Sequence, residues 1–195
     1  DPMDNNKVLD EIRLLINSPG ICTDSVFDLL YKHKCLYLLS RVINNSERCS
    51  GYLATNQMIQ KFRYNNCQGI FDRLNNSMPY AVIKGAVLSN SIYGKPFYRL
   101  SGDIDILVSR ENANKIAEIL AENGFQQGKV VNEKITPTSR KDILYHRLYT
   151  HQMASFQRKT DFLLSPFVAV DVNFDVTWGE EKKKINVNDF LAHTE

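Results

Sequence analysis

Apolar residues along the first part of the chain recur every three or four positions, which is the spacing of a helix face. In the segment 6–17 they place one apolar stripe on a helix: Val8, Ile12, Leu15 and Ile16. Comparable spacing predicts a second helix that begins after Asp24, a third over 35–43 and one long fourth helix over 51–77. The polar side of the fourth helix is rich in Asn and Gln and shows no catalytic cluster. We therefore expect the region 1–78 to be a helical support for the domain that follows.

From residue 79 the pattern changes to short apolar or alternating runs separated by helical segments. Strands are expected over the segments 80–85, 104–108, 125–131, 151–159 and 167–178. Helices are expected over the segments 86–94, 111–124, 139–150 and 185–195. This order predicts an α/β (α+β) domain over 79–195, in which helices pack against one face of a mixed sheet. A dinucleotide-binding fold is excluded, because the chain has no GxGxxG turn.

Finer expectations concern a strand and a helix of this domain. The run 125–131 is expected at the edge of the sheet. The helix over 111–124 is expected to be capped by Ser109 and to stop at Gly124, which can adopt the left-handed conformation that often ends a helix. Its buried stripe is expected to consist of Ala113, Ile116, Ala117 and Leu120.

Composition fits an ordinary globular chain. The protein has 195 residues, 43% of them hydrophobic and 24% charged, with a formal net charge of +2. This near-neutral balance gives no support for an extended nucleic-acid surface, although it leaves room for a small basic pocket for one triphosphate. No apolar run approaches the ~20 residues of a membrane span, and no signal peptide opens the chain. A cytoplasmic location is therefore expected, without a membrane partner.

The cysteines do not form a recognisable metal or disulfide pattern. None belongs to a CxxC pair, and all of them fall in the helical first third: Cys22, Cys35, Cys49 and Cys67. This arrangement favours buried reduced thiols over disulfides or a zinc site. For His146 and His151, surface positions are favoured over a general base or a zinc ligand.

The stretch "RLSGDIDILV" carries the first candidate chemistry. Side chains alternate between the two faces of a strand, so Asp103 and Asp105 emerge side by side among large apolar residues. Like charges held so close repel each other, and a raised pKa or a bound cation is the usual relief. We expect a divalent metal ion.

The strand "VAVDVNFDVTW" supplies a possible third carboxylate. One face is apolar, and the other carries Asp171, Asn173 and Asp175. If this strand lies beside the first, one of its aspartates, Asp171 or the rival Asp175, completes a three-carboxylate cluster. Mg²⁺ prefers such oxygen ligands, and two ions about 3.5–4 Å apart can clamp an in-line phosphoryl displacement.

These residues resemble a known family. The sequence "VIKGAVLSNSIYGKPFYRLSGDIDILV", followed by "VAVDVNFDV", is similar to the nucleotidyltransferase superfamily with the polymerase-β-like fold. Within it, the nearest pattern is that of a poorly characterised branch with a Lys-Gly turn, an Arg-x-x-x-Asp-x-Asp strand and a later acidic strand. The resemblance covers roughly 79–178. It implies a mixed sheet of that fold, preceded by the helical region.

The resemblance also implies an activity. Asp103, Asp105 and Asp171 would bind Mg²⁺ (or Mn²⁺), and Asp171 would help to deprotonate the attacking hydroxyl. An NMP group would move from an NTP, such as ATP, to a hydroxyl or phosphate acceptor, with release of pyrophosphate. A small molecule, a tRNA end or a protein are all compatible acceptors. The alternative is a catalytically degenerate domain that binds nucleotide or a protein partner.

The phosphate-binding residues and the departures from the family complete the expectations. Lys84, Gly85, Arg99 and Ser101 are the candidates for nucleotide binding, against the plainer interpretation of solvated charges and a tight turn. The usual Gly-Ser turn is Lys-Gly here, and Asn173 stands where the branch usually has His. Relatives continue into a further helical region that helps to close over the substrate. We therefore expect either a fragment without this C-terminal lid or a short member that obtains its lid elsewhere.

Overall fold

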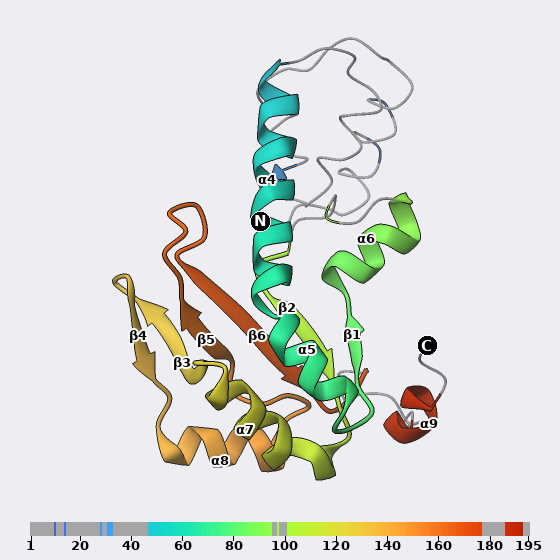
Figure 1. Ribbon diagram of the computed structural model, residues 1–195, viewed down its shortest axis with the longest axis vertical. Coiled ribbons are helices and arrows are strands. Elements are labelled where there is room, and N and C mark those ends of the chain that lie inside the picture. Colours follow the sequence, from blue (N-terminus) through green and yellow to red (C-terminus); the bar gives the residue numbers. More distant parts are fainter. Residues whose placement is uncertain are drawn as a thin grey trace.

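The computed structural model describes residues 47–94, 97, 101–176 and 186–192, together with the single residues 10, 14, 28, 31 and 32. Its helices are α4 (Glu47–Asn66), α5 (Gln68–Asn75), α6 (Gly85–Tyr93), α7 (Ala113–Glu122), α8 (Arg140–Tyr149) and α9 (Val187–Leu191), with a 3₁₀ turn at Arg110–Asn112. Its strands are β1 (Ala81–Ile83), β2 (Ile104–Leu107), β3 (Gln126–Val131), β4 (Lys134–Pro137), β5 (Phe156–Lys159) and β6 (Phe167–Asn173) (Figure 1). The expected α+β class with a mixed sheet is confirmed.

The six strands form one sheet in the order β1-β2-β6-β5-β3-β4. β2 and β6 are parallel, and the other pairs are antiparallel. The two aspartate-bearing strands are therefore direct neighbours near the middle of the sheet, which is the condition for a shared carboxylate cluster. Their register sets Asp105 opposite Asp171. This one pairing positions the candidate site.

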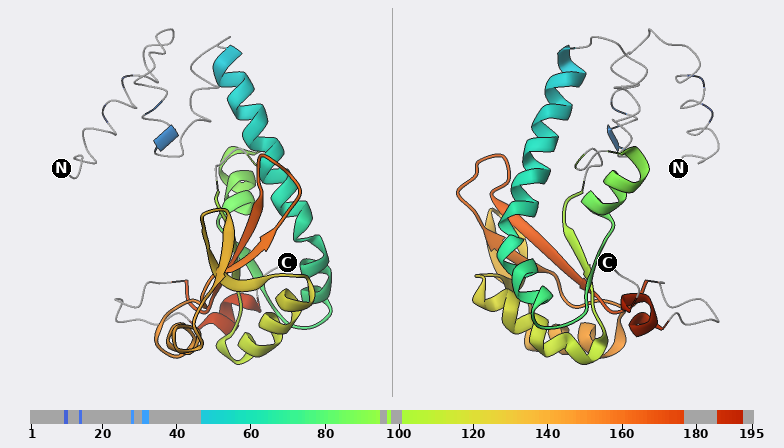
Figure 2. Two further views of the ribbon diagram at one scale, coloured as in Figure 1. Left: turned by 90° about the vertical axis from the view of Figure 1, so that its left-hand side faces the viewer. Right: turned by 45° about the vertical axis from the view of Figure 1, so that its right-hand side comes forward.

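One face of the sheet forms the hydrophobic core. Alternate residues of β2 and β6 point into it: Ile104, Ile106, Val168, Val170 and Val172. Helices α5 and α7 pack on this face and lie on the same side of the sheet in Figure 2. The core therefore includes side chains from α5, which belongs to the region expected to act as a support. The division of the chain at residue 79 stays a prediction.

The start of α7 differs from the expected helix. Ser109 precedes a 3₁₀ turn, and its side chain makes no cap hydrogen bond to a backbone N–H. It binds side chains instead: its hydroxyl donates to Glu111 and accepts from Asn112. The buried stripe includes Ile119 in place of Ala117, which is only partly buried. The stop at Gly124 is confirmed by its positive φ of 79°.

The expected long helix over 51–77 is interrupted. It begins earlier, at Glu47, and breaks at Cys67 into α4 and α5. The guanidinium of Arg158 donates to both the carbonyl and the side-chain oxygen of Asn66. The amide of Ile70, which would bind the Asn66 carbonyl in a continuous helix, binds the Cys67 carbonyl. A contact with a residue far along the chain thus ends the helix.

Cys67, at this break, is a buried reduced thiol, as expected for the cysteines of this chain. Cys67 is free and fully buried, and burial raises the pKa of its thiol to about 12. Cys22 and Cys35 lie outside the described residues, as do nearly all of the helices expected before residue 44.

The prediction for β3 as an edge strand was wrong. β3 pairs with both β5 and β4, and β4 forms the edge. Asn132 and Glu133 connect β3 to β4 with φ of 49° and 59°, as a tight hairpin of the I′ kind requires. This short hairpin was missed because Glu is an unusual residue at such a position. Pro137 suits the edge, where no ladder donor is needed.

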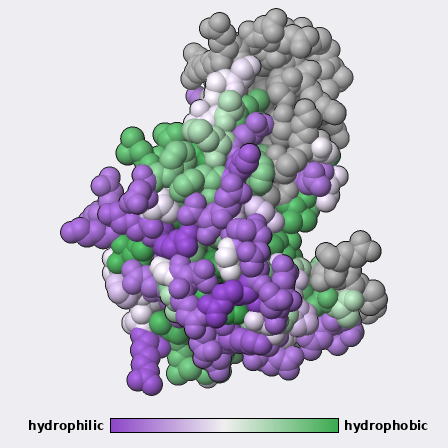
Figure 3. All heavy atoms as spheres, viewed as in Figure 1, coloured by the Kyte–Doolittle hydropathy of each residue, from purple (hydrophilic) through white to green (hydrophobic). Residues whose placement is uncertain are grey.

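Surface features agree with a globular chain. Hydrophilic side chains cover much of the face shown in Figure 3, with smaller apolar patches between them. Within the described ranges, no helix is long and apolar enough to cross a membrane.

The hairpin gives a test of the fold. A Cβ added at Gly128 would lie 2.6 Å from the carbonyl oxygen of Thr136 and 2.9 Å from Ile135 Cγ2. Gly128→Ala should therefore lower the free energy of unfolding by about 1–3 kcal/mol in urea titrations. Gly51→Ala in α4 is the control, because no atom lies within 4 Å of its added Cβ. That variant should be unchanged or gain about 0.5–1 kcal/mol. Equal effects at both positions would contradict the hairpin packing.

Candidate functional site

Three carboxylates gather on the sheet face opposite the core. Asp105 is in β2, Asp171 lies opposite it in β6, and Asp103 directly precedes β2. Asp105 is only 6% exposed. The charges of Asp103 and Asp105 both raise the pKa of Asp171, so the groups are close enough to interact. The structure thus brings together the carboxylates that the sequence singled out.

Asp171 has the least satisfied environment of these groups. Burial is the main reason that its pKa is raised, a hydrogen bond with Ser155 opposes the rise, and the neighbouring aspartates add to it. Its Oδ1 atom is buried and has no hydrogen-bond partner. A buried carboxylate oxygen without a donor is costly, and such an atom commonly marks the place of a missing water or ion.

Asp105 is already neutralised by an internal cation. The ammonium of Lys84 lies 2.9 Å from Asp105 Oδ1, and its side chain is half-exposed. The amide of Asn173 donates to the same oxygen at 3.3 Å. Lys84 was expected to contact a phosphate, and in this structure it contacts the carboxylate. Asn173, which replaces the usual His, acts as a hydrogen-bond donor to the site.

The Lys84–Gly85 turn has an unusual backbone. Both residues have positive φ, 68° and 54°, where β1 ends and α6 begins. A lysine in this conformation is strained, by roughly 1–3 kcal/mol, and such strain clusters at ligand sites. A Cβ on Gly85 would lie 3.6 Å from Ser101 Oγ, so Ser101 backs the turn. The positive N-terminal end of α6 therefore opens beside the aspartates.

Side chains from α4 reach the loop that carries Asp103. Gln60 Nε2 and Arg63 Nη1 both donate to the carbonyl of Ser101, at 2.5 and 2.7 Å. The hydroxyl of Ser101 lies 2.8 Å from the carbonyl oxygen of Asp103 and 3.1 Å from its Oδ1. This contact could not be predicted from the sequence beyond the spacing of Gln60 and Arg63, which places them on one helix face.

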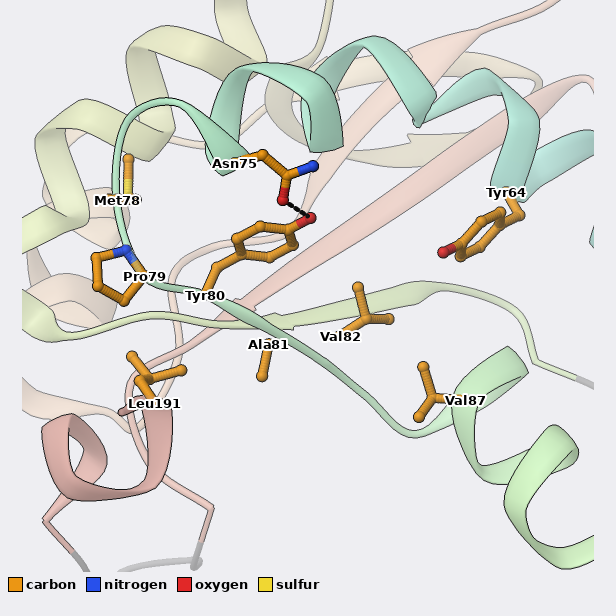
Figure 4. Close-up of a pocket in the computed structure, with 9 residues that line it drawn as sticks. All are labelled: Tyr64, Asn75, Met78, Pro79, Tyr80, Ala81, Val82, Val87 and Leu191. Atoms are coloured by element: carbon orange, nitrogen blue, oxygen red, sulfur yellow. Dashed lines mark hydrogen bonds between the residues drawn. The ribbon is translucent and has the colours of Figure 1, made fainter. Parts of the chain in front are cut away.

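Two cavities adjoin the turn. A small one of about 20 Å³, with room for about one water, lies between α4, the turn and the start of β2. A larger pocket of about 550 Å³ runs along the open edge of β1 and shares Tyr64 and Val82 with the small cavity. In Figure 4 Tyr80 lies over this pocket with its hydroxyl bound to Asn75, while Val87 enters from α6. Its volume falls in the range of small-molecule sites.

The three aspartates are the residues that could hold a metal ion. Their oxygen donors suit a hard cation such as Mg²⁺, and the orphaned oxygen of Asp171 leaves one acceptor free for it. Among the described residues, no three His, Cys, Asp or Glu side chains are already gathered into a metal-binding group. The donor set therefore fits in chemistry, while its side chains would have to move closer together and Lys84 would have to leave Asp105.

The remaining candidates are less central. β6 ends at Asn173, the chain bends at Phe174, and Asp175 lies beyond the strand. The expected strand over 167–178 is therefore shorter where it is described. Arg99 and Trp178 lie outside the described residues.

The raised pKa of Asp171 makes stability depend on pH. Below the ordinary value of 3.8, folded and unfolded chains both carry a protonated Asp171, and stability is lost as the pH rises through the higher folded pKa. The free energy of unfolding of Asp171→Asn should therefore exceed that of the parent protein at pH 7 by on the order of 1 kcal/mol. Near pH 3 the two should be equally stable.

Urea titrations at several pH values measure this difference. Asp161→Asn, at an exposed position, is the matched control and should show no such gain. Lower stability of Asp171→Asn at neutral pH would mean that this carboxylate accepts structural hydrogen bonds.

Comparison with known proteins identifies the family. No curated protein and no solved structure matches the chain. A family model described as uncharacterised nucleotidyltransferase matches residues 24–195. This match covers most of the chain, including the turn and all three aspartates. The chain therefore belongs to this nucleotidyltransferase family.

Proposed function

We propose that the protein is a metal-dependent nucleotidyltransferase that moves an NMP group from an NTP to a hydroxyl or phosphate acceptor. The observation that carries the proposal is the register of β2 and β6, which sets Asp105 beside Asp171 with Asp103 close by. Membership of the family supports a transferase. A protein that only packed this sheet would have no use for three interacting carboxylates on a largely buried face.

The metal would be held by Asp103, Asp105 and Asp171. Bound there, a divalent cation would neutralise the carboxylates and polarise the phosphate oxygens of the nucleotide. The free acceptor atom at Asp171 Oδ1 supports this assignment.

Lys84 has two alternative partners in the proposal. Without nucleotide it neutralises Asp105 at 2.9 Å. Its side chain is half-exposed and can therefore turn to a phosphate when another cation takes its place on the carboxylate. The triphosphate would lie at the N-terminal end of α6, where Gly85 lets the backbone approach closely.

Asp171 would take the proton in the transfer step. An acceptor oxygen forms a bond to the α-phosphorus, and the bond from that phosphorus to the pyrophosphate oxygen breaks. The acceptor proton passes to Asp171, which lies opposite Asp105 on the same face of the sheet. Asn173 does not titrate, so its amide would orient Asp105 instead.

The alternative function is a degenerate domain that binds nucleotide or a partner without turnover. The ion pair between Lys84 and Asp105 favours it, because it resembles a permanent replacement of the metal charge. The unpartnered oxygen of Asp171 speaks against it, because Lys84 leaves that acceptor unsatisfied.

Thermal melting separates these functions. Mg²⁺ with ATP should raise the melting temperature by about 5 °C or more at ~100 times the dissociation constant, while either alone should do much less. The reason is that only the ternary complex satisfies both carboxylates and phosphates. An equal shift by ATP in excess chelator would favour the degenerate domain.

Alanine variants of Asp171 and Asp175 test the transfer step. Asp171→Ala should slow pyrophosphate release by ~10²-fold or more, because it loses a metal ligand and the base. Asp175→Ala should keep measurable turnover, with at most a changed acceptor preference, because Asp175 lies beyond the end of β6. Single-turnover release from ATP, with water or glycerol as a generic hydroxyl acceptor, measures both. The reverse ranking would contradict the assignment of Asp171.

A further inference from the structure

The Ser101 carbonyl receives two donors from one helix. Gln60 Nε2 lies 2.5 Å and Arg63 Nη1 2.7 Å from this oxygen, and both side chains belong to α4. A carbonyl oxygen has two lone pairs, so these donors satisfy it fully. Gln60 and Ser101 are both buried. The backbone just before Asp103 is therefore fixed from outside the sheet.

Ser101 transmits this constraint to the site. Its hydroxyl hydrogen-bonds the Asp103 carbonyl at 2.8 Å. Its side chain also lies against the turn, since a Cβ on Gly85 would meet it at 3.6–3.7 Å. Ser101 thus stands between the turn and Asp103, and the position of its backbone sets the spacing between them.

The other side of Arg63 reaches the loop before β6. Its Nε donates to Ser165 Oγ at 2.9 Å, and that hydroxyl donates to the carbonyl of Phe167, the first residue of β6. The rings of Phe62 and Phe162 pack beside this contact, with centroids 4.4 Å apart. One guanidinium therefore joins the loop of Asp103 to the strand of Asp171.

Simple packing does not explain an arginine at this position. Burial lowers the pKa of Arg63, and the charge of Asp103 opposes the change. Withdrawing a cation from water is costly, and an apolar side chain would pack the helix without that cost. The planar guanidinium, however, can donate in two fixed directions at once.

We propose that Arg63 and Gln60 are positioning residues that hold the Asp103 loop and β6 at the spacing required for metal and nucleotide binding. This inference rests on the proposed function and extends it to α4. The helix is then part of the binding machinery, and loss of its contacts weakens the metal site while the sheet stays folded.

Electrostatics and positioning make opposite predictions for Arg63. Removing a positive charge close to Asp103 would by itself strengthen cation binding. Loss of the Ser101 contact should weaken it, because the carboxylates are no longer held together. The sign of the change therefore distinguishes the two effects.

The experiment titrates Mn²⁺ against the protein without nucleotide and measures bound manganese by equilibrium dialysis, so that the midpoint reports on the cation alone. Arg63→Met should raise the Mn²⁺ concentration for half-maximal binding about tenfold. Arg63→Lys should raise it by a smaller factor, because lysine keeps one donor for the Ser101 carbonyl. The number of sites per folded molecule should stay the same in both. Reduced folding alone would lower the number of sites and leave the midpoint unchanged.

Controls make the outcomes distinguishable. Arg73→Met removes an equal charge from α5, where Arg73 forms an exposed ion pair with Glu122, and should leave the midpoint unchanged. Asp103→Asn should abolish Mn²⁺ binding.

If the Arg63 variants bind Mn²⁺ as tightly as the parent protein or more tightly, the positioning role is overturned and the proposed function stands. If the parent protein binds no Mn²⁺, the proposed function and the inference resting on it both fail.

Discussion

The parallel pairing of β2 with β6 sets two carboxylates side by side on a largely buried sheet face, and their repulsion constrains the rest of the site. Asp105 and Asp171 share a register position, and Asp103 adds its charge close by. Apolar residues on the other face of both strands fix that register, since a slip by one residue would turn Val170 and Val172 out of the core. The hydrophobic core thus enforces an electrostatically unfavourable arrangement, which a cation would relieve.

The described contacts relieve this repulsion unevenly. Lys84 and Asn173 both bind Asp105 Oδ1, while Asp171 keeps a buried oxygen without a donor and a raised pKa. The strained turn that carries Lys84 lies at the N-terminal end of α6. The same short segment therefore binds the Asp105 carboxylate and is expected to bind a phosphate. Asp105 Oδ1 has two donors, whereas Asp171 Oδ1 has none. This difference is the strongest physical sign that the site is incomplete without a ligand.

Local sequence pattern was enough to predict the α+β class with a mixed sheet and the strands that carry the aspartates. The alternation in β2 and β6 fixes which residues share a face, and the family resemblance favours Asp171 over Asp175 as the proposed metal ligand. Contacts between distant segments were not predictable in this way. The break at Cys67 depends on Arg158, and the partner of Lys84 depends on the antiparallel register of β1 with β2. The hairpin to β4 was missed because its turn uses Glu133 at positive φ.

We propose that Asp103, Asp105 and Asp171 jointly hold a divalent metal beside a nucleotide. The most direct test is a crystal structure of the protein with Mn²⁺ and a non-hydrolysable NTP, in which anomalous scattering locates the metal. We expect manganese in direct contact with these carboxylates, the triphosphate at the Lys84–Gly85 turn, and Lys84 withdrawn from Asp105. Nucleotide bound with Lys84 still on Asp105 and no manganese at the aspartates would contradict this proposal.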